Sequence, residues 1–188
     1  MPSETRPCFR RHITIEKMMT LKTAPLKRRF AAILYEMLLA GAATCPAALL
    51  AGIAAIFLNP VSAALSALVT SILIVGSWWL YFRANWHGQG QTLAMRTWKI
   101  GLCDLNGIQP SLHLLRLRFI WACIFTVFVP ALAYAGLRHF LGIPPKGAAG
   151  AALIWLILPW GFALLNPDRQ FLYDFLAGTR LVDVKEQS

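Results

Sequence analysis

Long uninterrupted apolar stretches dominate the pattern of this chain. The 46 residues between Glu36 and Arg83 contain no Asp, Glu, Lys, Arg or His, whereas a helix needs only about 20 apolar residues to cross a bilayer. An Asn-Pro pair at residues 59–60 interrupts the stretch, and this pair is typical of a turn. The pattern therefore predicts two membrane helices joined by a short loop, over about residues 30–58 and 61–82.

Two further uncharged stretches cover residues 119–137 and 147–165. Each has 19 residues, which is enough for one membrane span. Three of the four spans contain a proline, which membrane helices tolerate and which predicts a kink: Pro46, Pro130 and Pro159. The predicted fold class is an all-α membrane protein with four transmembrane helices.

The segment between the second and third spans has a pattern of its own. Residues 91–96 predict a short surface helix, and residues 97–103 alternate apolar and polar side chains as a strand does. Asn106-Gly107 is typical of a hairpin turn, so residues 108–110 are expected to return as a second strand. Ser111 is the expected N-cap of the third helix.

The C-terminal segment repeats this mixture of short elements. Residues 168–176 predict an interfacial helix that ends at Gly178, and residues 179–184 alternate again. We expect these residues to pair with the β segment at 97–103. The expected result is a small patch of a β-hairpin and an interfacial helix at the membrane surface.

The basic residues predict the orientation of the spans. Of the 18 Lys and Arg, 16 would lie on the side of both termini and only 2 on the other side. The positive-inside rule then places both termini and the β patch in the cytoplasm, and the protein in the cytoplasmic (inner) membrane. The net charge of +10 predicts contact with anionic lipid headgroups rather than with nucleic acid.

Composition agrees with a membrane protein and excludes a soluble enzyme. Hydrophobic residues make up 57% of the chain and charged residues 14%, against about 45–50% and about 25% in soluble domains. The first apolar stretch is too long for a cleaved signal peptide. We expect a disordered basic tail at 1–27, a transmembrane domain at 28–184 and a short tail at 185–188. Met18-Met19 offers an alternative start of translation.

The sequence contains no pattern of a catalytic or metal site. The four cysteines form no C-x-x-C pair and are interpreted as small buried hydrophobes or inert thiols: Cys8, Cys45, Cys103 and Cys123. The histidines lack metal-ligand spacing, and the first two spans contain no His or Lys that could activate a serine. We therefore expect no enzyme activity, no metal and no cofactor.

Three segments together resemble a known family. They are Arg28-Arg29-Phe30-Ala31-Ala32 followed by Glu36; Gly90-Gln91-Thr92-Leu93 with Lys99-Ile100-Gly101 and Asn106-Gly107; and Asp168-Arg169 with Tyr173-Asp174 and Ala177-Gly178-Thr179. Their order and spacing resemble the RDD family of small multi-pass bacterial membrane proteins, named for one arginine and two aspartates. The resemblance covers roughly residues 26–184.

The resemblance implies which residues form the site. Arg29 matches the family arginine, Asp174 matches the second aspartate, and Glu36 stands where the family has its first aspartate. Glutamate keeps the carboxylate but places it on a longer side chain. The family resemblance implies a transport role.

Two interpretations of Glu36 follow from its place in an apolar helix. A charge in hydrocarbon costs about 2.5–3.5 kcal/mol on insertion scales, so it should face the bundle interior or water. Glu36 is then either a proton or cation site two turns from Arg29, or the fixed partner of an arginine such as Arg83 or Arg116. Asp174 likewise has two interpretations. One is an ion pair that docks the C-terminal helix, in which Asp168, Arg169 and Asp174 near the membrane surface pair with Arg96, Lys99, Arg116 or Arg118. The other is a point on the cytoplasmic side where ions enter.

Two functions from different classes remain at this point. The first is transport of monovalent cations or protons. We expect a homo-oligomer, because one acidic residue at membrane depth in a single chain supplies few polar groups for an ion pathway. The second is a membrane adaptor whose cytoplasmic face binds a partner protein or lipid.

Overall fold

The computed structural model describes residues 23–184 of the chain. These residues form two compact units, one of residues 27–100 and one of residues 101–184 together with 23–26. Most of the expected N-terminal tail and all of the expected C-terminal tail lie outside the described residues.

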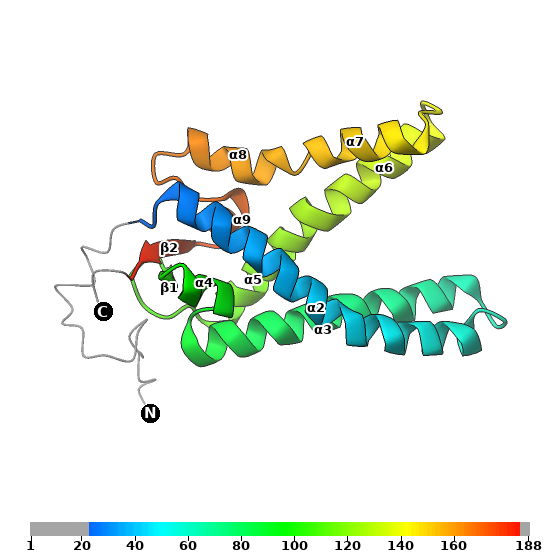
Figure 1. The fold of residues 1–188 in the computed structure, drawn as a ribbon, viewed down its shortest axis with the longest axis horizontal. Coiled ribbons are helices and arrows are strands. Elements are labelled where there is room, and N and C mark those ends of the chain that lie inside the picture. Colours follow the sequence, from blue (N-terminus) through cyan, green and yellow to red (C-terminus); the bar gives the residue numbers. More distant parts are fainter. Residues whose placement is uncertain (1–22, 185–188) are drawn as a thin grey trace. The chain divides into compact units, whose positions relative to one another are not determined.

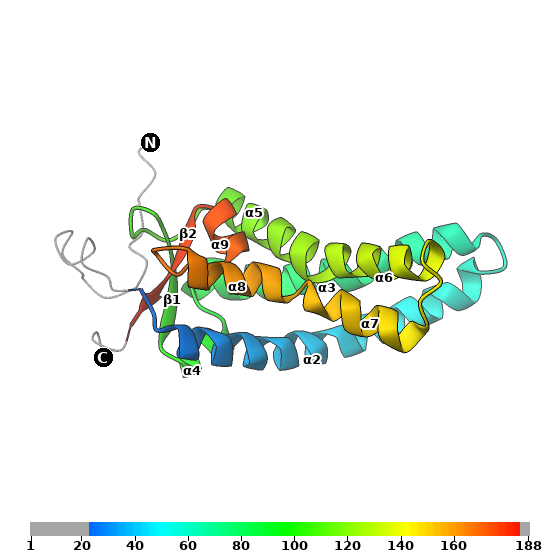
Figure 2. The ribbon, with the colours of Figure 1, turned by 90° about the horizontal axis from the view of Figure 1, so that it is seen from above.

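The first unit is built on a helical hairpin. Helices α2 (Leu26–Leu58) and α3 (Ala63–Gln89) run antiparallel to each other (Figures 1 and 2). The predicted Asn-Pro turn separates them. Ser62 begins α3, because its Oγ accepts a hydrogen bond from the Leu65 N–H at 3.3 Å. Pro46 lies inside α2 without ending it.

A short helix, α4 (Leu93–Thr97), follows α3 after a turn at Gly90. Gly90 has φ 65°, a left-handed conformation that glycine adopts at little cost. Thr92 caps α4 by accepting a hydrogen bond from the Met95 N–H at 3.2 Å. The helix predicted at 91–96 is therefore present, and it begins two residues later because Thr92 takes the capping position.

The second unit begins its membrane part with one continuous helix. It consists of α5 (Leu112–Cys123), the π-helical turn η1 (Ile124–Phe128) and α6 (Val129–His139). Within the π turn, the Val129 N–H donates to the carbonyl of Ile124, five residues earlier. Pro130 follows directly, and a proline has no N–H and crowds the carbonyl four residues before it. The irregularity predicted at Pro130 thus takes the form of a π turn.

The fourth span is divided into α7 (Pro145–Ile154) and α8 (Ile157–Leu165). Helix α7 packs against α6. The division falls at Trp155, which lies four residues before Pro159. The proline cannot donate to the Trp155 carbonyl and its ring crowds that carbonyl, which explains the irregular turn there.

Four helices are long and apolar enough to cross a membrane, namely Leu26–Leu58, Ala63–Trp86, Leu112–His139 and Pro145–Leu165. The four predicted spans are therefore confirmed as apolar helices. The third begins earlier than residue 119 because Ser111 caps it, accepting from the Leu114 N–H at 3.4 Å. The helix thus includes Arg116 and Arg118, which precede the uncharged stretch.

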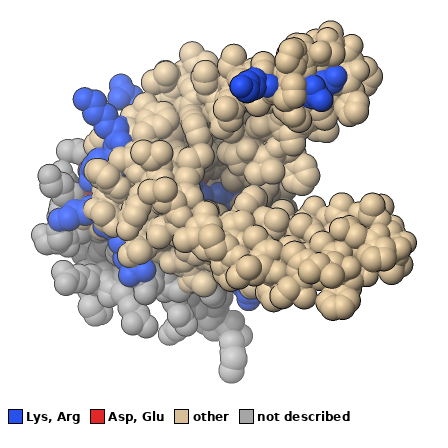
Figure 3. All heavy atoms as spheres, turned by 45° about the vertical axis from the view of Figure 1, so that its right-hand side comes forward, with Lys and Arg blue, Asp and Glu red and all other residues tan. Residues whose placement is uncertain are grey.

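The surface of these helices is apolar. Large side chains are widely exposed on all four, for example Leu49 (71%), Leu68 (58%), Leu132 (71%) and Leu164 (75%). Figure 3 shows broad surfaces without charge on the helices, with Lys and Arg gathered toward the helix ends. Such surfaces suit lipid rather than water.

A small sheet completes the second unit. Strand β1 (Ile100–Asp104) pairs with β2 (Thr179–Asp183), and the short helix α9 (Leu172–Leu176) precedes β2. The predicted pairing of the two β segments is confirmed. Before α2, Thr23 forms an antiparallel bridge with Val182.

The β-hairpin predicted around Asn106-Gly107 is present only in part, because the returning segment is reduced to one β-bridge residue, Ile108. The turn is present, but the described residues after it form no strand, and the Asp104 N–H donates to the Ile108 carbonyl at 2.9 Å. The Asp104 Oδ1 accepts the N–H groups of Asn106 and Ile108 at 2.9 and 2.8 Å. These bonds close the turn on itself, and Pro110 has no N–H for a ladder.

Candidate functional site

Three of the charged side chains that the sequence singled out, Glu36, Arg118 and Asp174, lie in two polar clusters, one in each unit. We call them the Glu36 cluster (Glu36, Tyr81 and Thr92) and the Arg118 cluster (Arg118, Gln170, Tyr173, Asp174 and Thr179).

The Glu36 cluster joins three helices of the first unit. Glu36 lies in α2, Tyr81 in α3, and Thr92 at the start of α4. The Tyr81 hydroxyl donates to Glu36 Oε1 at 2.9 Å, and the Thr92 hydroxyl donates to Oε2 at 2.5 Å. Each carboxylate oxygen therefore accepts one hydroxyl group, and charge strengthens both bonds.

Thr92 holds its position through a second bond. It is fully buried, and its Oγ1 accepts the Met95 N–H while donating its proton to Glu36. The same hydroxyl thus begins α4 and orients the carboxylate of α2. Glu36 and Tyr81 are half-buried, so the cluster combines one buried hydroxyl, that of Thr92, with a partly exposed carboxylate.

A second polar contact joins the hairpin further along α2. The Trp78 Nε1–H donates to the Thr44 Oγ1 at 2.7 Å, and the Thr44 hydroxyl donates to the Ala40 carbonyl at 2.7 Å. Trp78 precedes Tyr81 by three residues, so both side chains lie on one side of α3. This contact adds a second polar link between α2 and α3, about two helical turns along α2 from Glu36.

The chemistry of the Glu36 cluster is that of an oxygen site. One carboxylate and two hydroxyl oxygens converge, and hard cations prefer oxygen ligands. Across residues 23–184 there is no group of three or more His, Cys, Asp or Glu side chains that could hold a metal ion. The cluster's donor set is therefore oxygen only, with no nitrogen or sulfur ligand among its three side chains.

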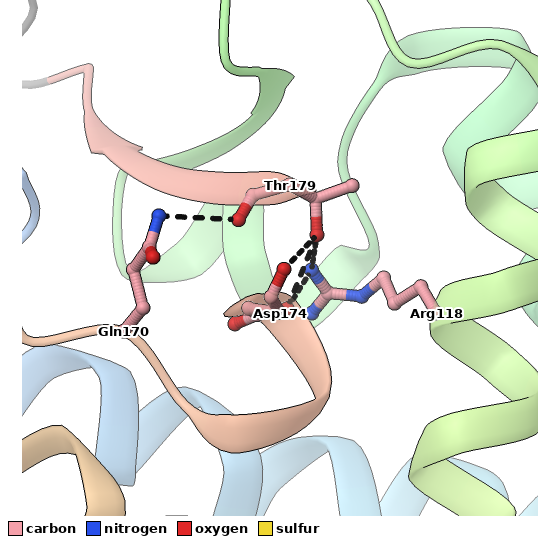
Figure 4. A network of polar contacts seen from close by, with 4 residues as sticks. All are labelled: Arg118, Gln170, Asp174 and Thr179. Carbon is pink, nitrogen blue, oxygen red and sulfur yellow. Dashed lines mark hydrogen bonds and ion pairs between the residues drawn. The ribbon is translucent and has the colours of Figure 1, made fainter. Parts of the chain in front are cut away.

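The Arg118 cluster is buried almost completely (Figure 4). Arg118 of α5 forms an ion pair with Asp174 of α9, with side chains 6% and 1% exposed. The Arg118 Nη1–H donates to the Thr179 Oγ1 at 3.4 Å, and the Thr179 hydroxyl lies 3.4 Å from the Asp174 carbonyl. Gln170 donates to the Thr179 carbonyl at 3.4 Å.

This arrangement docks the C-terminal segment onto α5. Gly178, with φ 65°, turns the chain from α9 into β2 and brings Thr179 back toward Asp174. The Arg118 guanidinium also lies 5.5 Å from the centre of the Tyr173 ring, a cation–π distance. Every polar group of the cluster comes from α5 or from residues 170–179. The contacts of the cluster therefore hold the C-terminal segment against α5.

The other residues singled out from the sequence lie elsewhere. Arg29 is buried in the first turns of α2, with 1% of its surface exposed. Arg83 and Arg116 are exposed, and neither is among the partners of Glu36 in the described part of the chain. Asp168 and Arg169 are also exposed and lie outside the Arg118 cluster.

Sequence reasoning missed the hydroxyl groups of both clusters. Thr92 carried a usable signal, because threonine directly before a predicted helix is a typical N-cap. Tyr81 was indistinguishable from an aromatic residue at the membrane interface. Gln170 and Thr179 lie in segments whose pattern indicated only a helix and a strand.

One interpretation of the cysteines needs correction. Cys103 is fully buried in β1 and is disulfide-bonded, whereas Cys45 and Cys123 are free thiols. Its expected state as an inert thiol is therefore wrong, because spacing along the chain does not reveal a cross-link between distant segments.

Four span-forming helices, a two-stranded sheet and buried polar clusters define a multi-pass helical membrane protein. Residues 23–178 match the RDD family, so the chain belongs to this family and the resemblance is confirmed. No curated protein and no solved structure matches the chain.

Proposed function

We propose that this RDD-family protein transports protons or monovalent cations across a membrane, with Glu36 as the group that binds and releases the ion. The observation that carries the proposal is the position of Glu36 between the Tyr81 and Thr92 hydroxyls on span-forming helices. An ionisable side chain inside a membrane helix is costly and usually marks an ion pathway.

The geometry suggests how the site works. Glu36 lies ten residues after Leu26, the first residue of α2, which is about 15 Å along the helix. An ion that reaches the carboxylate meets two hydroxyl oxygens that can rotate from donating a proton to accepting or ligating. Protons and cations then compete for the same carboxylate, which is the basis of exchange.

A single chain supplies few polar groups for a complete pathway. Within residues 23–184, Glu36 is the only acidic side chain in the four predicted spans, which cover residues 30–58, 61–82, 119–137 and 147–165. The two halves of the chain also lack the inverted repeat common in alternating-access carriers. We therefore propose that the transporter works as a homo-oligomer, in the cytoplasmic membrane.

The test is ion flux by the purified full-length protein in liposomes. The wild type should exchange Na⁺ or K⁺ for protons, measured with a pH-sensitive dye inside the vesicles. Glu36→Gln keeps the shape of the side chain and removes its charge, so flux should be lost. Glu36→Asp restores the family aspartate and should retain flux.

Asp168→Asn is the matched control, because Asp168 is an exposed acid outside both clusters. It should leave flux unchanged. Wild-type liposomes without flux, or Glu36→Gln with full flux, would overturn the proposal. Absence of flux in every variant is what the second function, a membrane adaptor, predicts.

A further inference from the structure

The first unit has a strongly unequal charge distribution. Residues 27–100 contain six Lys and Arg but a single acidic residue, Glu36. Glu36 is half-buried and accepts two hydroxyl hydrogen bonds. The exposed charged side chains of this unit are therefore basic and complementary to an anion.

Part of this charge gathers on α4 and the turn after it. Helix α4 buries Ala94 and Met95, at 0% and 6% exposure, and turns Arg96 outward. Leu93 and Trp98 are also exposed, at 45% and 37%. Apolar and basic side chains exposed together on a short helix are typical of an element in the plane of a membrane interface.

The start of α2 adds to the same surface. The Arg28 Nη1–H donates to the Trp98 carbonyl at 3.2 Å, which joins the first turn of α2 to the end of α4. Lys27, next to Arg28, and Lys99, next to Trp98, are both exposed. We call this surface the α4 basic patch; it consists of Lys27, Arg28, Leu93, Arg96, Trp98 and Lys99.

The place of the patch in the fold indicates what covers it. Helix α2 begins its span at Leu26, and the span of α3 ends at Trp86, seven residues before α4. The patch thus lies near the ends of two helices that are long and apolar enough to cross a membrane, which is where lipid headgroups are expected. Basic side chains at this depth attract anionic lipid phosphates, and tryptophan rings prefer the same layer.

We propose that the α4 basic patch binds the phosphate headgroup of an anionic phospholipid. Arg96 and Lys99 contact the phosphate, while Leu93 and Trp98 enter the upper acyl layer. The occupant is a lipid rather than a soluble anion, because an exposed leucine and tryptophan beside the charges require an apolar environment. This inference goes beyond transport and holds for either function of the protein.

The experiment measures lipid binding to the full-length protein in detergent by native mass spectrometry. The probes are phosphatidylglycerol, phosphatidylcholine and inorganic phosphate. The double variant Arg96→Gln/Lys99→Gln removes two charges from the patch. The matched control Arg138→Gln/Lys146→Gln removes one arginine and one lysine, both exposed, from the α6–α7 hairpin.

The wild type should bind phosphatidylglycerol more tightly than phosphatidylcholine. The patch variant should lose about fivefold in phosphatidylglycerol affinity for each charge removed, and the control variant should bind as the wild type does. Trp98→Ala keeps all charges and should weaken phosphatidylglycerol binding without lowering the preference for anionic lipid.

Several outcomes would overturn the proposal. Equal losses in both double variants would indicate a general effect of net charge, and an unchanged patch variant would exclude the patch. Binding of inorganic phosphate that depends on Arg96 without preference for phosphatidylglycerol would indicate a site for soluble anions. If the double variant does not fold, Arg96→Gln against Arg96→Lys provides the same comparison.

Discussion

Arg118 and Asp174 show how much the C-terminal segment depends on single side chains. Both are almost fully buried and form an ion pair. Asp174→Asn leaves the arginine buried without its counter-charge, and breaking a buried pair costs about 3–5 kcal/mol. We expect unfolding in detergent at correspondingly lower temperature or denaturant concentration, whereas Asp168→Asn on the surface should change stability by less than about 0.5 kcal/mol.

The double variant Arg118→Met/Asp174→Leu distinguishes the contribution of the ion pair to stability from the contribution of side-chain packing. Replacing both charges by apolar groups leaves no buried charge. The double variant should therefore be less destabilised than the sum of the two single variants, as measured in a double-mutant cycle. Strict additivity would show that the two side chains do not stabilise each other.

Thr92 makes a separate prediction, because one hydroxyl has two roles. Thr92→Val removes the cap of α4 and the hydrogen bond to Glu36, while keeping the shape of the side chain. A buried group left without its partner costs about 1–3 kcal/mol. Thr92→Ser keeps the hydroxyl and should unfold as the wild type does. A loss of stability in Thr92→Ser without a loss in Thr92→Val would instead show that the methyl group matters and the hydroxyl does not.

The candidate site was only partly predictable at the scale of residues. An acid inside an apolar helix is visible in any sequence, which is why Glu36 was singled out. Its partners were not, because Tyr81 and Thr92 are 45 and 56 residues away along the chain and carry no charge. The sequence does not indicate to which distant carboxylate a hydroxyl group donates its hydrogen bond.

At the scale of elements, Gly178 is the position where backbone conformation most restricts the choice of residue. Its φ of 65° favours glycine, and a Cβ there would meet no atom within 4 Å. The cost of Gly178→Ala is therefore one of backbone strain alone, about 1–2 kcal/mol. Thermal unfolding should show this loss.

Gly150→Ala is the control, since a Cβ there also meets nothing and the residue lies inside α7. Alanine favours a helix over glycine by about 0.5–1 kcal/mol, so this variant should be as stable as the wild type or more so. Equal destabilisation by both substitutions would contradict the backbone explanation.

Elements with strong periodicity or clear end signals followed from the sequence. The four spans, the cap at Ser111 and the pairing of β1 with β2 depend on apolar length, capping chemistry and alternation. The strand predicted to return after β1 does not form, because the Asp104 carboxylate binds the backbone N–H groups that such a strand needs. Such local side-chain bonds override the Asn-Gly signal.

At the scale of the whole molecule, charge and apolar surface divide the chain in a way that predicts its insertion. The apolar helices expose large side chains, and every Lys and Arg lies outside the uncharged stretches 37–82, 119–137 and 147–165. An even number of spans predicts that both termini lie on one side. The excess of basic residues expected on that side predicts that it faces the cytoplasm.

Reporter fusions test this orientation directly. A periplasmic reporter should be active after Pro60 and Pro145, the two turns that face away from the basic segments. A cytoplasmic reporter should be active after Asn106 and after Ser188. The expected 16 basic residues on one side against 2 on the other give a bias that removing a single charge should not invert, so Lys146→Gln should keep the wild-type pattern.

A cytoplasmic signal after Pro145 would remove one span, and both termini would then no longer lie on the same side. Arg96 and Lys99 of the α4 basic patch would still lie in the segment between the second and third spans, so the lipid proposal would survive while the four-span topology would not.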